Sequence, residues 1–83
     1  MTFVSFLVVL NFTYLNKNPY SMPDTKIEYF KANSIAKLSR LTIADKNSNN
    51  YVVRDFCEIT TNTKNKYIIN NDCNYVKDRL NGI

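Results

Sequence analysis

The sequence predicts a small α+β domain in which a short sheet is covered by a long amphipathic helix and a short C-terminal helix. Three observations predict this fold class. Phe3 to Leu15 is rich in apolar and aromatic residues and carries no charge, apolar residues recur at helical spacing over residues 24–41, and strand-forming residues surround Tyr67. A mostly helical domain is the alternative.

The length of the chain limits it to one hydrophobic core. With 83 residues, two independent cores would each fall near the lower limit of domain size, so residues 1–83 are expected to form a single domain. The chain is 45% apolar, which is typical of a folded chain and not of a disordered one. Gly82 is the only glycine, so Asn, Asp and Ser are expected to form the turns.

The first fifteen residues allow three interpretations: a buried strand, a signal or anchor segment over residues 1–15, or a surface for a membrane or a partner. No Lys or Arg precedes the apolar run, and no small-residue cleavage pattern follows it closely, which argues against a signal segment. The run is also shorter than the roughly 20 residues that a membrane-spanning helix needs. Its Val, Phe, Thr and Tyr content favours the buried strand, and with it a cytoplasmic over a secreted location.

A long helix is predicted from Asp24 to about Leu41, after a loop over residues 16–23 that contains both prolines. Asp24 is a suitable N-cap for this helix. Four apolar residues fall within an arc of about 80° on a helical projection, which predicts one buried face. These residues are Ile27, Phe30, Leu38 and Leu41.

Another flank of the same helix gathers the candidate residues for binding an anion or a nucleic acid. They are Lys26, Tyr29, Asn33, Lys37 and Arg40. A basic ribbon beside an aromatic ring can follow a phosphate backbone and stack on a base, so this face predicts RNA or DNA binding. The alternative is an ordinary solvated helix face.

Ser34 to Ile43 resembles the first-helix pattern of the small subunit of bacterial and organellar glutaminyl and asparaginyl tRNA amidotransferases. The resemblance covers ten of the 83 residues, with the sequence Ser-Ile-Ala-Lys-Leu-Ser-Arg-Leu-Thr-Ile, and it implies a helix there. The second helix and the extended tail of that family have no counterpart in Asp45 to Ile83. The chain is therefore not assigned to the family.

The middle of the chain combines a polar loop with a segment of mixed character. Residues 45–50 are polar and predict a loop. Residues 51–60 have the composition of a strand, but their apolar positions share one arc of a helix. We predict a helix from this periodicity, and a strand is the alternative.

The C-terminal segment predicts a short strand followed by a helix. Lys66 to Asn70 contains consecutive β-forming residues and predicts the strand. The helix is predicted over Cys73 to Asn81, with Asn71 or Asp72 as its N-cap. Gly82 is expected to end this helix in a left-handed conformation.

Cys57 and Cys73 are the only cysteines. A disulfide and two buried free thiols are both compatible with their spacing. A bond across this spacing would stabilise the domain by roughly 3 kcal/mol in the chain-entropy model. Two cysteines without any His cannot complete a tetrahedral zinc site, and the spacing is not that of a Cys-x-x-Cys redox pair, so no metal is expected.

The composition argues against catalysis. The chain has no His and no glycine-rich loop, so it lacks the commonest acid–base residue and cannot form a P-loop or a dinucleotide fingerprint. We therefore expect neither an enzyme nor a cofactor. The leading hypothesis is a small basic binding module that acts through contact with an unidentified protein.

Two alternative functions remain from the sequence: nucleic-acid binding through the basic helix face, and a small secreted effector stabilised by one disulfide. The net charge of +4 suits an anionic partner, although it is also common in domains without one. A membrane partner is disfavoured. A short sheet with an open edge also predicts self-association into a homo-oligomer.

Overall fold

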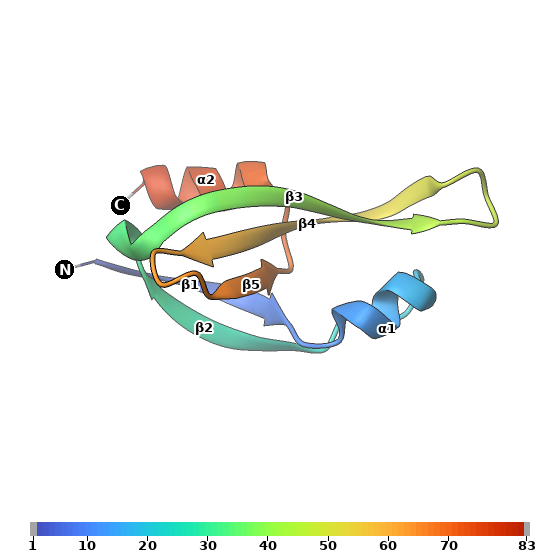
Figure 1. Ribbon diagram of the computed structural model, residues 1–83, viewed down its shortest axis with the longest axis horizontal. Coiled ribbons are helices and arrows are strands. Elements are labelled where there is room, and N and C mark those ends of the chain that lie inside the picture. The colour runs from blue at the N-terminus through green and yellow to red at the C-terminus, as the bar shows by residue number, and fades with distance from the viewer. Residues whose placement is uncertain (1, 83) are drawn as a thin grey trace.

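The computed structural model describes residues 2–82 and shows a five-stranded antiparallel sheet with two α-helices (Figure 1). The order of the strands is β2-β1-β5-β4-β3. The elements are β1 (Phe3–Val9), α1 (Phe12–Lys17), β2 (Thr25–Lys31), the 3-10 helix η1 (Ala32–Ser34), β3 (Ile35–Asp45), β4 (Tyr51–Thr61), β5 (Lys66–Ile69) and α2 (Cys73–Asn81). Strands account for 49% of the described residues and helices for 22%, so the prediction of an α+β domain with a long helix is wrong.

The long helix predicted over residues 24–41 is absent, and β2, η1 and β3 occupy this segment. Asp24 is not an N-cap, because its carbonyl accepts a hydrogen bond from the Leu10 amide at 2.7 Å and so extends the β1–β2 ladder. Ile27, which the helical projection places inside, is 59% exposed. The residues that resemble an amidotransferase helix lie mainly in strand β3, so the helix that this resemblance implies is also absent.

The helix predicted over residues 51–60 is a strand, β4, which forms a long hairpin with β3. Asn49 and Asn50 adopt positive φ angles of 53° and 58° in the connecting turn, as the scarcity of glycine predicts. Asp45 closes the turn by accepting a hydrogen bond from the Asn47 amide at 2.9 Å. This bond and one from the Tyr20 hydroxyl lower the pKa of the Asp45 carboxyl.

The β3–β4 hairpin buries one face at one end and the opposite face at the other end. This change of face explains why its apolar residues are spaced as in a helix. Leu38 pairs with Ile59 and packs with one core, whereas Leu41 pairs with Phe56 and packs with the other. Residues three apart on a strand point to opposite faces. The spacing of Leu38 and Leu41 therefore reflects a strand that changes its buried face and not one side of a helix.

Helix α2 covers the first core. The buried members of this core are Val4, Phe6, Val8, Phe30, Cys57, Ile59, Ile69 and Val76. The predicted helix over Cys73 to Asn81 is confirmed, with Asp72 as its N-cap, because the Asp72 carboxylate accepts a hydrogen bond from the Tyr75 amide at 2.8 Å. Gly82 ends the helix at φ −80° and not in the left-handed conformation that we predicted.

Helix α1 covers the second core, which consists of Val9, Leu15, Ile43 and Phe56. The predicted N-terminal strand is confirmed over Phe3–Val9, but the apolar run then continues into α1 instead of extending the strand. The predicted strand near Tyr67 is confirmed as β5. The opening segment therefore contributes to both cores.

Few main-chain pairs join the β1–β2 hairpin to the other three strands of the sheet. β1 pairs with β2 over seven residues, but its register with β5 consists of the single pair Val8 and Ile69. Residues 41–56 of the β3–β4 hairpin project from the rest of the molecule (Figure 1). We call them the arm, and α1 lies beneath its base. The arm gives the molecule an elongated shape with extents of 46 × 20 × 20 Å.

Candidate interaction surface

The outer face of the β1–β2 hairpin carries four exposed apolar side chains. We call this surface the outer hairpin face: Phe3, Leu7, Ile27 and Tyr29, which are 55%, 42%, 59% and 70% exposed. In the register, Leu7 lies opposite Ile27 and Ser5 lies opposite Tyr29, so these side chains share one face of the hairpin. The alternate residues Val4, Phe6 and Val8 point into the first core. Clustered exposed apolar residues of this kind are typical of an interaction site.

Helix α2 borders this surface with Tyr75 and Arg79. A hollow of about 190 Å³ lies between the helix and the strands, and its lining includes Leu7, Ile27, Tyr75 and Arg79. Tyr75 is 42% exposed and adds a further aromatic ring beside the hairpin. The outer hairpin face and the exposed side of α2 therefore meet in one concave surface.

Arg79 fixes the position of α2 against β1. Its guanidinium lies 5.7 Å from the ring centroid of Phe6 and 6.0 Å from that of Tyr75, which are distances of cation–π contacts. Its Nη1 also donates to the Tyr75 hydroxyl at 3.3 Å. These contacts hold Tyr75 beside the hollow.

The structure does not bring the five predicted anion-binding residues together on one helix. Lys26 and Tyr29 lie in β2, Asn33 lies in η1, and Lys37 and Arg40 lie in β3. β2 and β3 are the two outermost strands of the sheet order. The helical ribbon on which the nucleic-acid hypothesis rests is therefore absent, and the hypothesis itself stays a prediction.

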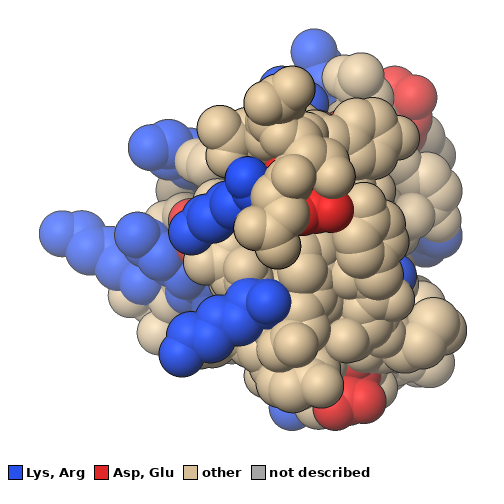
Figure 2. Space-filling model, turned by 90° about the vertical axis from the view of Figure 1, so that its right-hand side faces the viewer, with Lys and Arg blue, Asp and Glu red and all other residues tan. Residues whose placement is uncertain are grey.

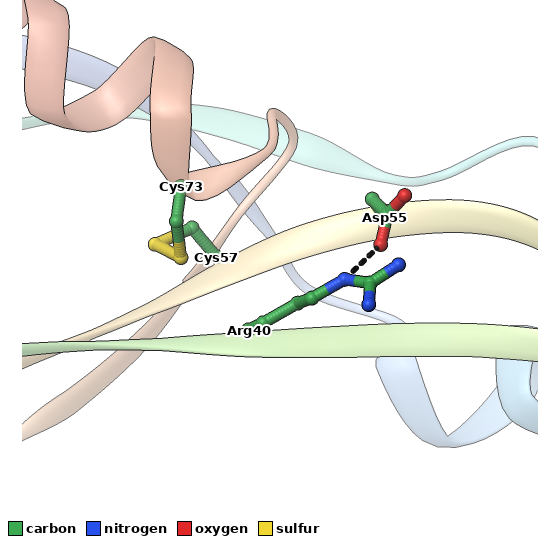
Figure 3. Close-up of polar contacts among 4 residues, drawn as sticks. All are labelled: Arg40, Asp55, Cys57 and Cys73. Atoms are coloured by element: carbon green, nitrogen blue, oxygen red, sulfur yellow. Dashed lines mark hydrogen bonds and ion pairs between the residues drawn. A yellow bond between two sulfur atoms is a disulfide. The ribbon is translucent and has the colours of Figure 1, made fainter.

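Two of these cations are paired with carboxylates of their own chain. Lys26 Nζ lies 2.8 Å from Glu28 Oε1, and Arg40 Nε lies 2.7 Å from Asp55 Oδ1 (Figure 3). The hydrogen bonds to these carboxylates raise the pKa of both cationic groups. Figure 2 shows that most of the Lys and Arg side chains visible at the arm end project on the left-hand side of this view, and that the others lie apart at the top, right and bottom.

A disulfide joins Cys57 in β4 to Cys73 at the start of α2 (Figure 3). Of the two states that the sequence allows, a disulfide and two free thiols, the structure shows the disulfide. The Cα atoms lie 4.7 Å apart, and Cys57 is fully buried in the first core. The bond fixes the first turn of α2 over the sheet, and α2 in turn borders the outer hairpin face.

Within residues 2–82, no three His, Cys, Asp or Glu side chains are placed so that they could hold a metal ion. The helices of this part of the chain are all too short or too polar to cross a membrane.

No protein-family model, no curated protein and no solved structure matches this chain.

Proposed function

We propose that the protein is a small non-enzymatic binding module that recognises another protein through the outer hairpin face and the adjoining side of α2. The observation that carries this proposal is the cluster of four exposed apolar residues on a regular strand pair. Exposed side chains on a rigid sheet can bind with little loss of conformational freedom. Aromatic residues such as Phe3, Tyr29 and Tyr75 are also enriched at protein interfaces.

The charges around the surface support a partner with an apolar centre and an acidic border. Lys31 lies opposite Phe3 in the register, and Arg79 lines the hollow beside Leu7. Between these two cations, the outer hairpin face presents uncharged side chains. Its centre therefore suits apolar protein surface better than a phosphate backbone, which requires closely spaced cations.

Replacing Leu7 and Tyr29 together with Thr is expected to reduce capture of the partner by on the order of tenfold or more, because Thr keeps the strand propensity but removes apolar contact area. The measurement is affinity capture from the native source of the protein, with quantification by mass spectrometry. Tyr51→Thr with Val52→Thr is the matched control, since these residues are 63% and 41% exposed on the arm. Equal capture by both variants would contradict the proposal, and capture lost on nuclease treatment would favour nucleic-acid binding instead.

A second candidate is a small secreted effector stabilised by its disulfide. The observation that favours it is the Cys57–Cys73 bond, because disulfides persist in oxidising compartments. We expect the intact mass of the native protein to stay unchanged on thiol alkylation before reduction and to gain two adducts after reduction. Two alkylated cysteines without prior reduction would argue against this candidate.

A further inference from the structure

The outer edge of β2 presents main-chain groups that have no strand partner within residues 2–82. In the β1–β2 ladder, the Leu10 amide donates to the Asp24 carbonyl and the Ala32 amide donates to the Thr2 carbonyl. Alternate residues of an antiparallel strand direct their main-chain groups to opposite edges. The even-numbered residues of β2 therefore bond to β1, and the main-chain groups of Thr25, Ile27, Tyr29 and Lys31 point to the open edge, where the Lys31 carbonyl already accepts a hydrogen bond from the Ser34 hydroxyl.

This edge differs from the edge at the other side of the sheet. β2 keeps an unbroken register with β1 from Thr25 to Lys31. β3, the other outermost strand, has an extra residue, Ala36, between Ile35 and Lys37, whereas at the second register shift the extra residue, Val53, lies in its inner partner β4. A bulge disrupts pairing at a sheet edge, so the edge of β2, which has no bulge over its whole length, is suited to accept another strand.

The charges of β2 distinguish among the antiparallel pairings of two copies that are centred on Lys26, Ile27 or Glu28. In an antiparallel arrangement centred on Ile27, Lys26 lies opposite Glu28 of the second copy, and Glu28 lies opposite its Lys26. A centre at Glu28 would instead place the two Glu28 side chains opposite each other, and a centre at Lys26 would do the same with the two lysines. Like charges directly opposite are destabilising, so the centre at Ile27 is favoured.

The same arrangement satisfies the open main-chain groups. Ile27 pairs with Ile27 of the second copy, and Thr25 pairs with Tyr29, so these three of the four edge residues exchange hydrogen bonds. The pairing is isologous, and it closes after two copies.

We propose that the chain forms a two-fold dimer by antiparallel pairing of β2, centred on Ile27. The dimer joins two sheets into one and brings two outer hairpin faces side by side. It does not depend on the proposed function, since it requires no other protein and uses the edge of the hairpin instead of its face.

The test is sedimentation velocity of the purified protein over a range of concentrations at low salt. We expect the wild type to dimerise as its concentration rises. Lys26→Glu and Glu28→Lys are each expected to weaken the dimer by on the order of tenfold, because each puts like charges at both cross-strand pairs. An equal mixture of the two variants is expected to recover dimer, since every opposed pair is then complementary.

Ile27→Pro is the variant that tests the main-chain pairing. The Ile27 amide points away from β1, so proline there removes a donor from the open edge and leaves the intramolecular ladder intact. Far-UV circular dichroism verifies the fold of each variant. A wild type that stays monomeric, a dimer that Ile27→Pro leaves unchanged, or a mixture that recovers no dimer would each overturn the proposal.

Discussion

Replacing Cys57 and Cys73 together with Ala is expected to lower the free energy of unfolding by about 3 kcal/mol. The bond closes a loop across a sequence separation of 16, so its loss restores conformational freedom to the unfolded chain. The total stability of so small a domain is on the order of 5 kcal/mol, which makes this a large fraction. The measurement is urea-induced unfolding followed by far-UV circular dichroism.

Reduction of the disulfide in the wild type distinguishes the effect of losing the bond on stability from the effect of losing the contacts of the cysteine side chains. Cys57 is fully buried, so the Ala variant also loses apolar contacts, whereas the reduced protein retains both side chains. We expect reduction to account for most of the loss. Amide exchange in α2 should accelerate before exchange in β1, because a nine-residue helix is marginal without its attachment. An unchanged unfolding midpoint after reduction would contradict the expectation.

The elements that the sequence predicts correctly are those with one buried face or a local signal at their ends. Strand β5 contains consecutive β-forming residues, and α2 starts at Asp72, whose carboxylate accepts the Tyr75 amide as an N-cap. β1 was predicted from its apolar, β-forming composition, and its burial alternates up to Val8 before Val9 is buried as well. These signals are local, so a sequence pattern captures them without knowledge of the neighbouring elements.

The spacing of apolar residues could not predict β3 and β4 as strands, because tertiary packing decides which of their faces is buried. Phe56 and Cys57 are adjacent and both buried, since one contacts α1 and its core while the other lies beneath α2. No single period describes such a strand. A stronger local signal was the polar loop at residues 46–50 between two β-branched runs, which is typical of a hairpin.

The candidate surface was missed for the same reason. A helical interpretation of residues 24–41 places Ile27 in the core and groups Lys26 with Arg40, whereas the strands expose Ile27 and separate the two cations. The prediction of self-association through a strand edge is untested, although β2 now supplies a specific edge for it. Interaction surfaces on sheets follow from strand register, and register requires the partner strand to be known.

Phe56→Ala is expected to destabilise the protein by about 3–5 kcal/mol, because removal of a buried aromatic ring leaves a cavity in the second core. Phe56 is 1% exposed, and its ring lies edge-on to Phe12 with centroids 6.0 Å apart. The arm is two-stranded, and a two-stranded ribbon is marginal unless another element packs on it. Loss of Phe56 therefore weakens both the docking of α1 and the base of the arm, and urea-induced unfolding measures the effect.

Amide hydrogen exchange shows whether the damage is local to the second core. We expect exchange to accelerate first around Ile43 and Leu15, which share this core, and later around Val76, which lies in the first core. Tyr51→Ala on the same strand is the matched control, because its side chain is 63% exposed and its removal should change stability by about 0.5 kcal/mol or less. Equal destabilisation by the two variants would show that α1 and the arm do not form a packed core around Phe56.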